Sequence, residues 1–419
     1  MASPPSRVGA FLKLSRKARV ESEFGARGLL AASVPHVAAL EALADPLMLV
    51  TGEHPDDLTG RRIVFANAAA RELFRLPPDG GRLVSALRNP EVLEAIDESL
   101  FGAGPRECLY EPRGAQERIW RVRTTPLEAI AGPADGGGAK LAMVHFRDET
   151  DARRAERSRV DFLANASHEL RTPLASLSGF IETLRGHAKD DPEARDQFLR
   201  IMTVQAERMS RLIDDLMSLS RIELNEHIPP SGSCDLALAV MDVVDALRLM
   251  TAAKGVALDL QLPERGVAEI AGDRHQIVQV VQNLLDNALK YSSAGGSVRV
   301  EVITGLTAAA AASVATPAFA GASGASRLSL LTPDRSRDEA RYVILRITDT
   351  GPGMSREHLP RLAERFYRVE GQKSGERLGT GLGLAIVKHV MNRHRGGLIV
   401  ESAPGLGAAF TAYFPTSMI

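Results

Sequence analysis

The sequence predicts a multidomain fold in which an α+β domain, an antiparallel helical hairpin and an α/β domain follow one another. Three observations predict it. The 419 residues correspond to about three domains of roughly 150 residues each. Helical periodicity without a strand signal marks residues 149–222, and helical and strand-like runs alternate over residues 235–416. The expected segments are a basic tail at 1–35 and domains at 36–148, 149–230 and 231–419.

The composition is that of an ordinary globular protein. Hydrophobic residues make up 44% of the chain and charged residues 25%, which excludes wholesale disorder. The 51 Lys and Arg residues against 52 Asp and Glu residues give a formal net charge of −1, so we expect no nucleic-acid partner. The cysteines Cys108 and Cys234 lie far apart, which excludes a disulfide framework and a zinc site and favours a cytoplasmic location.

The first residues form a basic tail. Five basic residues precede the first acidic one: Arg7, Lys13, Arg16, Lys17 and Arg19. We expect this tail to be disordered, with peripheral membrane contact as the alternative interpretation. No run of the ~18–20 apolar residues needed to cross a bilayer occurs in the sequence, so no transmembrane segment is predicted.

Residues 36–148 mix strand-like runs with helical stretches, which predicts an α+β domain. The strand-like runs are Pro46–Val50, Arg62–Ala66, Arg118–Thr124 and Ala139–Phe146, and the helical stretches are Ala68–Phe74 and Pro90–Phe101.

A heptad repeat predicts the hairpin. Leucines recur every seven residues, with apolar residues or Pro three positions later: Leu163, Leu170, Leu177 and Leu184, then Ala166, Pro173 and Phe180. After a break at Gly186–Asp191, Asp191 is a suitable N-cap and Pro192 a suitable first helical residue. The second helix repeats the pattern at Met202, Met209 and Leu216, and at Gln205, Leu212 and Leu219. A single hairpin would leave one face of its helices exposed to solvent. We therefore expect a homodimer that forms a four-helix bundle.

The heptad repeat of apolar residues, the seam of the hairpin, places His168 on the outward face of its helix. With Leu163 at heptad position a, His168 falls at position f, and Thr172 follows four residues later on the same face. Pro173 removes a backbone hydrogen bond at a cost of ~3 kcal/mol, which suggests a special role for the preceding turn. An exposed neutral imidazole is a nucleophile that the neighbouring Glu169 can assist, so a phosphoryl-acceptor site is one interpretation. An ordinary solvated histidine is the other.

The last domain alternates the two kinds of element. Its predicted helices are Asp235–Lys254, Asp273–Tyr291 and Leu382–Arg395. Its predicted strands are Val256–Leu262, Ala268–Ala271, Ser297–Ile303, Arg341–Thr348, Leu398–Ser402 and Ala408–Phe414. The Ala-, Gly- and Ser-rich segment 304–340 lacks any period and is expected to be a disordered insertion.

Three segments of this domain together suggest a nucleotide site. Asn283, Asn287 and Lys290 share one helix face and suit a hydrated Mg²⁺ and phosphates, although two Asn on a helix are often simply solvated. Asp349 ends a strand before a glycine string, where a carboxylate can accept a hydrogen bond from an exocyclic amine. The string GTGLGL from Gly379 opens a helix whose N-terminal amides attract phosphate.

Two groups of motifs resemble sensor histidine kinases. The string DFLANASHELRTPL, from Asp161 to Leu174, resembles their dimerisation and phosphoacceptor motif. The resemblance implies that His168 is phosphorylated, that Glu169 is its general base, and that Thr172 orients water when the phosphorylated partner is hydrolysed. It also implies a homodimer and a response-regulator receiver domain as the partner that takes the phosphoryl group.

The last domain resembles the ATP-binding Bergerat fold, an α/β sandwich that kinases of this family share with gyrase-type ATPases. Four strings resemble its N box, first glycine box, F box and second glycine box: QNLLDNALKYS, DTGPGM, ERFYRV and GTGLGLAIVK. The resemblance implies Asn287 as the Mg²⁺ ligand with Asn283 beside it. It further implies ATP contacts at Lys290, Tyr291, Asp349, Gly351, Gly353, Tyr367, Arg368, Gly379, Thr380, Gly381, Leu382 and Gly383, with a mobile lid from Tyr367 to Leu378.

One position bears on the reaction. Gyrase-type hydrolases have a water-activating glutamate four residues before the metal-binding Asn, and this chain has Asn283 there. Asn is a poor base, so a free-standing ATPase is disfavoured. A scaffold that only docks a regulator is the other alternative, and the intact glycine boxes argue against it. The favoured hypothesis is a protein-histidine kinase with phosphatase activity toward its regulator.

The first domain carries a looser resemblance. RRIVFANAAARELF, from Arg61 to Phe74, resembles the start of a PAS sensor domain, and Ala139–Thr150 resembles its last strand and exit helix. An unrelated α+β module is the alternative. The layout is similar to that of the phosphate-regulon branch of sensor kinases without the usual membrane anchor.

Overall fold

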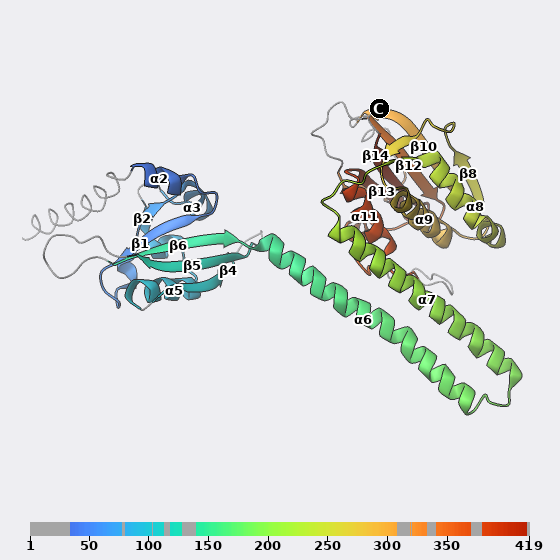
Figure 1. Ribbon diagram of the computed structural model, residues 1–419, viewed down its shortest axis with the longest axis horizontal. Helices are drawn as coiled ribbons and strands as arrows, with labels where there is room; N and C mark the ends of the chain where they lie inside the picture. The colour runs from blue at the N-terminus through green and yellow to red at the C-terminus, as the bar shows by residue number, and fades with distance from the viewer. Residues whose placement is uncertain are drawn as a thin grey trace, which may run out of the picture. The chain divides into compact units, whose positions relative to one another are not determined.

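The computed structural model divides the chain into two compact units, Met1–Val160 and Asp161–Ile419 (Figure 1). The residues it describes are 34–77, 80–102, 104–112, 118–127, 140–307, 319, 321–332, 341–369 and 379–416. Residues 1–33 of the predicted tail lie outside the described residues, whereas its last two residues, Val34 and Pro35, begin helix α2 (Val34–Glu41). Across the described ranges, no helix combines the length and the apolar character that a bilayer span requires.

The N-terminal unit contains one antiparallel sheet of order β3-β2-β1-β6-β5-β4. Its strands are β1 (Leu47–Gly52), β2 (Arg62–Ala66), β3 (Gly81–Arg82), β4 (Arg106–Tyr110), β5 (Trp120–Leu127) and β6 (Lys140–Asp148). Its helical segments are α2 (Val34–Glu41), η1 (Leu58–Gly60), α3 (Ala68–Phe74), α4 (Leu83–Ala86) and α5 (Pro90–Phe101). The four predicted strands and both predicted helices are confirmed within a few residues, whereas β4 and the short elements were not predicted.

A fully buried asparagine joins the first strands to the helices. Asn67 caps α3 by accepting from the Ala70 amide at 2.9 Å, and the same Oδ1 accepts from the Leu47 amide at 3.0 Å. Its Nδ2 donates to the Asp45 carbonyl at 2.8 Å. Because all these groups are satisfied, the chain can cross the core here without the cost of unpaired polar atoms.

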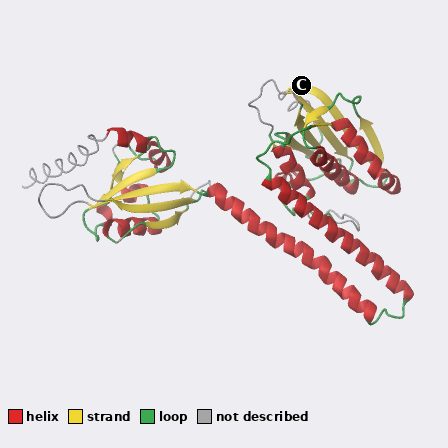
Figure 2. Cartoon of the chain, viewed as in Figure 1, coloured by secondary structure: helices red, strands yellow, loops and turns green. Residues whose placement is uncertain are grey.

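The hairpin consists of α6 (Thr150–Arg185) and α7 (Pro192–Leu224) (Figure 2). Asp191 caps α7 through the amides of Glu193 and Ala194, as predicted. The predicted seam residues are buried or half-buried, with one exception. Leu163 is 58% exposed, and Phe162 takes the inward place instead, with its ring centroid 6.0 Å from that of Phe366.

The rest of the C-terminal unit contains a six-stranded sheet of order β11-β13-β14-β12-β10-β8 and a small sheet formed by β7 and β9. The strands are β7 (Ser233–Asp235), β8 (Ala257–Gln261), β9 (Glu269–Ala271), β10 (Ser297–Thr307), β11 (Ser326–Leu331), β12 (Arg341–Asp349), β13 (Gly397–Ala403) and β14 (Gly407–Pro415). The helices are α8 (Leu236–Lys254), α9 (Arg274–Tyr291), η2 (Arg356–Arg361) and α11 (Gly383–Arg393). Helices α8, α9 and α11 share one apolar core with the sheet. Every predicted helix and strand of this region is present.

The expectation of a disordered loop over 304–340 is wrong in part. Strand β10 runs on to Thr307, and β11 pairs antiparallel with β13 at the edge of the sheet. The reason lies in the string SRLSLL, whose leucines pack against the core. This alternation of polar and apolar residues is a strand signal, and the Ala- and Gly-rich surroundings obscured it. Residues 308–318, 320 and 333–340 lie outside the described residues.

The hairpin and the last region form one unit because the end of α7 enters the same core. Leu212, Leu219 and Ile222 are buried in the core shared by α9 and α11. Polar contacts follow the same seam, since Arg365 is ion-paired with Glu223 at 2.5 Å.

A buried histidine supports the start of α9. His394 is 3% exposed; its Nδ1–H donates to the Val390 carbonyl at 2.8 Å, and its Nε2 accepts from the Asp273 amide at 3.2 Å. Burial lowers the pKa of His394, because the imidazolium would be desolvated. A protonated Nε2 would also lose its acceptor function at the N-cap.

This geometry predicts that the contribution of His394 to the stability of the C-terminal unit becomes less favourable in mild acid. The unfolded chain binds a proton at His394 below about pH 6.5 while the folded state does not, so the free energy of unfolding should fall by up to about 1.4 kcal/mol per pH unit. Urea unfolding followed by helical circular dichroism at pH 7.5 and 5.5 measures it. The His394→Gln variant should show a smaller pH dependence, and an equal one would contradict the assignment. Trp120, the single tryptophan, reports the N-terminal unit as a control.

Candidate functional site

The predicted acceptor residues lie in the middle of α6. His168 is exposed, as its heptad position predicts. The Thr172 hydroxyl donates to the His168 carbonyl at 3.2 Å, and buried Pro173 follows within the continuous helix. Glu169 is half-buried and accepts from Arg208 of α7 at 3.0 Å. The imidazole is therefore accessible to a second reactant. Thr172 is held by a hydrogen bond within α6, and Glu169 by one from α7.

The second glycine string packs directly on α9. A Cβ at Gly383 would lie 2.9 Å from Asn283 Oδ1, and one at Gly379 would lie 2.9 Å from Lys290 Nζ. A Cβ at either position would force the Asn283 or Lys290 side chain to move, so glycine is what permits the approach with these side chains in their present positions. The structure thus brings together two strings that are almost 100 residues apart in the sequence. Asn287 lies one turn after Asn283 on the same helix.

Asp349 is the most perturbed acid of the site. It is 5% exposed, and its Oδ1 accepts from the amides of Gly351 at 2.8 Å and Ala408 at 3.3 Å. Burial raises the pKa of Asp349 to about 6, while these two hydrogen bonds oppose the shift. Both bonds fall on Oδ1, which leaves Oδ2 to accept from a ligand.

Glycines allow three segments to converge on this carboxylate. Gly407 has a φ of 124°, and a Cβ there would lie 1.9 Å from the Asp349 carbonyl oxygen. A Cβ at Gly353, where φ is 65°, would lie 2.0 Å from the carbonyl oxygen of Ala403. Gly351 is buried and approaches the carbonyl of Tyr291 at the end of α9. A substitution at any of these positions would displace the backbone that holds Asp349.

The start of α11 differs from the other long helices. Its N-cap is Leu382, which makes no side-chain cap hydrogen bond, whereas Asp235 and Asp273 cap α8 and α9. The first amides of an uncapped helix attract anions. Thr380 accepts from the Leu382 amide at 3.3 Å and donates to Asp215 of α7 at 2.7 Å.

The F-box residues lie beside the same string. The Phe366 amide donates to the Gly381 carbonyl at 2.9 Å. The Tyr367 hydroxyl is 2.8 Å from His358 Nδ1, and Arg368 is half-buried next to it. Lys290 lies over the Tyr291 ring, with its Nζ 4.8 Å from the centroid. Most of the predicted lid, residues 370–378, is outside the described residues.

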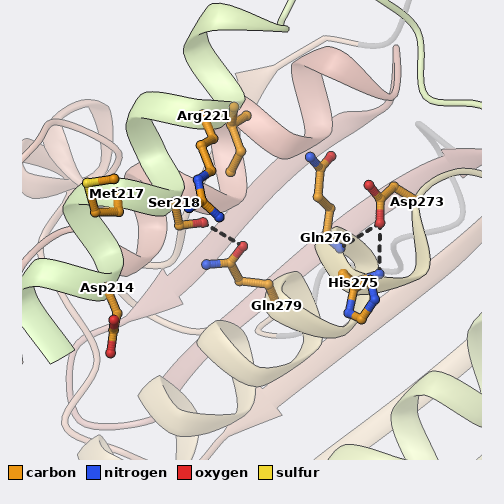
Figure 3. Close-up of a pocket in the computed structure, with 9 residues that line it drawn as sticks. Asp214, Met217, Ser218, Arg221, Asp273, His275, Gln276 and Gln279 are labelled. Carbon is orange, nitrogen blue, oxygen red and sulfur yellow. Dashed lines mark hydrogen bonds between the residues drawn. The ribbon is translucent and has the colours of Figure 1, made fainter. Parts of the chain in front are cut away.

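Sequence reasoning missed several of these partners. The sequence offered no indication of Asp215 or of the bond between Ala408 and Asp349; the glycines Gly405 and Gly407 beside Ala408 are the signal that could have pointed to this approach. A separate pocket of about 400 Å³ lies between α7 and α9 (Figure 3), where Ser218 donates to Gln279 at 2.9 Å. The residues predicted to bind a nucleotide are not among those that line this pocket.

The buried carboxylate predicts a stability penalty. Above about pH 6 Asp349 is charged in both states, and its raised pKa corresponds to a cost of about 3 kcal/mol in the folded state. The Asp349→Asn variant should therefore unfold at higher urea concentration than the wild type at pH 7.5. The gain should shrink at pH 5, where the folded carboxyl is already protonated. The exposed Asp196→Asn change is the control, and a destabilised Asp349→Asn protein would contradict the argument.

Comparison with known proteins agrees with this geometry. Residues 272–418 match the family described as histidine kinase-, DNA gyrase B- and HSP90-like ATPase. Residues 158–225 match the His Kinase A (phospho-acceptor) domain. The first match contains α9, Asp349 and the second glycine string, and the second contains His168, so ATP binding is a property of the last domain.

Individual relatives cover more of the chain. The phosphate regulon sensor protein PhoR of Pseudomonas aeruginosa is 30% identical over 398 residues, which are 94% of this chain and 77% of PhoR. The sensor-like histidine kinase SenX3 of Mycolicibacterium smegmatis is 29% identical over 276 residues, 66% of this chain and 62% of SenX3. The solved histidine kinase AdeS of Acinetobacter baumannii aligns with a TM-score of 0.41 and 24% identity over 60% of this chain and 98% of AdeS. The chain therefore belongs to the sensor histidine kinases of two-component systems and is an ATP-binding protein-histidine kinase.

Proposed function

We propose that ATP bound in the last domain phosphorylates His168, and that an aspartate of a response-regulator receiver domain then takes the phosphoryl group. The observation that carries the proposal is the exposed imidazole at His168. It lies in the same compact unit as the uncapped start of α11, which packs on the half-buried amide of Asn283. The proposed domain limits are 36–148, 149–230 and 231–419.

The chemistry at His168 can be written with balanced bonds. A lone pair on one imidazole nitrogen attacks the γ-phosphorus, the bond from phosphorus to the bridging oxygen breaks, and ADP leaves. The proton on the other ring nitrogen passes to Glu169, which acts as general base. In the second step the P–N bond breaks as a P–O bond forms to the aspartate of the regulator, and the proton returns from Glu169 to the ring, which restores the neutral imidazole. Thr172, on the same face as His168, would orient water for the reverse task of hydrolysing the phosphorylated regulator.

The site residues divide between the two ends of ATP. Asp349 Oδ2 accepts from the exocyclic amine of adenine, and Gly351 and Gly353 let the backbone approach the ring. The amides at Thr380, Gly381, Leu382 and Gly383 receive phosphate oxygens at the start of α11, as helix N-termini do. Lys290, Tyr291, Tyr367, Arg368 and Gly379 complete the phosphate side.

Asn287 is the proposed Mg²⁺ ligand, with Asn283 beside it. The donor set suits this ion, because Mg²⁺ prefers oxygen ligands and keeps several waters and phosphate oxygens. The described residues contain no group of three or more His, Cys, Asp or Glu side chains that could enclose a metal. The Asn287 amide would hold the ion together with the nucleotide, and the bound ion would neutralise charge on the phosphates.

A homodimer is proposed from the outer face of the hairpin. Exposed apolar side chains recur along heptad position e of both helices: Val160, Leu174 and Ile181 on α6, and Leu199 and Ile213 on α7. A stripe of this kind would remain in water in a single chain, and burying it in a second copy gives a four-helix bundle.

The N-terminal unit is proposed to be a PAS-like sensor domain. Its sheet order supports this, with β1 central and the helices inserted between β2 and β4. Strand β6 leads into α6 at Thr150, so a change in the sensor can reach the helix that carries His168.

The first test of the proposal is autophosphorylation with radiolabelled ATP and Mg²⁺. The wild-type chain should acquire an acid-labile, base-stable label, as a phosphoramidate requires, and His168→Ala should acquire none. His187→Ala is the matched control because His187 is also exposed in the hairpin. Label that persists in His168→Ala would refute the acceptor assignment, and fast ATP turnover in that variant would indicate a free-standing ATPase.

The same preparation tests Thr172. The Thr172→Ala chain should keep autophosphorylation and lose roughly 10²-fold in dephosphorylation of a labelled regulator, the size typical of a group that assists proton or water positioning. Equal dephosphorylation by wild type and variant would remove Thr172 from the reaction.

The dimer has its own test. Replacing Leu174 and Ile181 together by glutamate places charges in the proposed interface, so the molar mass measured by light scattering should fall from that of two chains to that of one. Replacing the exposed polar residues Ser176 and Glu182 by alanine is the control. A mass that stays at two chains in the glutamate variant would contradict this interface.

A further inference from the structure

An ion pair between the two hairpin helices holds the residue next to His168. Arg208 Nη2 donates to Glu169 Oε2 at 3.0 Å. With Leu170 and Met209 at position a of their helices, Glu169 and Arg208 both occupy position g. Antiparallel neighbouring helices place g opposite g, so the heptad register itself brings these side chains together.

The two members of the pair differ in exposure. The Arg208 side chain is 17% exposed and that of Glu169 is 38% exposed. Ion pairs at this degree of exposure contribute little to stability. Loss of the pair should therefore leave the fold intact, and any large effect on the reaction has to come from the position of the carboxylate.

The contact is specific to one carboxylate oxygen. Oε2 accepts the charge-assisted bond from Arg208, so Oε1 is the oxygen left for the imidazole of His168. A guanidinium on one oxygen also limits the rotation of the carboxylate, because charge-assisted bonds are directional. Without Arg208 the Glu169 side chain would be free to turn into solvent, away from the position that the proposed proton transfer requires.

We propose that Arg208 is a positioning residue for the phosphorylation of His168: it binds Glu169 Oε2 and thereby directs Oε1 toward the imidazole. This rests on the proposed function, in which His168 is the acceptor and Glu169 its base. The rival interpretation is an ion pair that only fixes the register of the hairpin.

The test measures single-turnover autophosphorylation at saturating ATP in the full chain. Arg208→Gln should lower the rate about 10-fold, since small misplacements of a catalytic group cost one to two orders of magnitude. Arg208→Lys should recover much of it, because an ammonium can still bind one oxygen. The ATP dissociation constant and the melting temperature should stay near wild type in both. Arg200→Gln, on the exposed face of the same helix, is the matched control.

A double-mutant cycle separates the possible failures. Glu169→Gln should slow the reaction by about 10²-fold, and Arg208→Gln should add nothing further in that background if Arg208 acts through Glu169. If Glu169→Gln leaves the rate unchanged, the proposed role of Glu169 fails. If Glu169→Gln is slow but Arg208→Gln is normal, or if the two losses multiply, only the positioning role fails. A lowered melting temperature with a matching loss in Arg208→Lys would support the register interpretation.

Discussion

The heptad register of α6 and α7 is the constraint on which the functional arrangement depends. Burying positions a and d between the two helices leaves three other positions with separate environments. Position f, where His168 lies, points to solvent. Position e carries the apolar stripe of Leu174 and Ile213, and position g carries Glu169 and Arg208. A shift of one residue in the register would exchange all three, so the seam sets the chemistry of the surface as well as the packing.

The same register connects the hairpin to the ATP-binding domain. Phe162 and Asp215 are also at position g, and they contact Phe366 and Thr380 of the F box and the second glycine box. Burial raises the pKa of Asp215, and the hydrogen bond from Thr380 opposes that shift. The hairpin face that carries Glu169 thus continues into the face that touches the F box and the second glycine box, so the proposed base and these two boxes share one side of α6 and α7.

Asp349 lowers the stability of the folded state, and its proposed role in binding adenine accounts for its presence. A carboxylate at this depth is unfavourable in the folded state, and its pKa of about 6 expresses that cost. The surrounding glycines give no packing of their own, since Gly407 is fixed by its approach to the Asp349 backbone. The carboxylate satisfies the amides of Gly351 and Ala408 with one oxygen, and in the proposed function its other oxygen accepts a hydrogen bond from adenine. Binding sites that destabilise the fold are retained for their function, and the hydrophobic core around them compensates for the lost stability.

The sequence by itself determined which segments are helices and strands, where α7, α8 and α9 begin, and that His168 is exposed. These features depend on periodicity, caps and neighbours in the chain, so local patterns encode them. Only the tertiary structure decided that Ala408 binds Asp349, that Arg208 binds Glu169, that Thr380 binds Asp215, and that Ser326–Leu331 extends the sheet. Such contacts join residues from 39 to 165 positions apart, and they depend on how whole elements pack. A repeat or a cap within one segment does not specify how that segment packs on another. The packing depends on the shapes of helix and sheet surfaces that meet only in the folded chain.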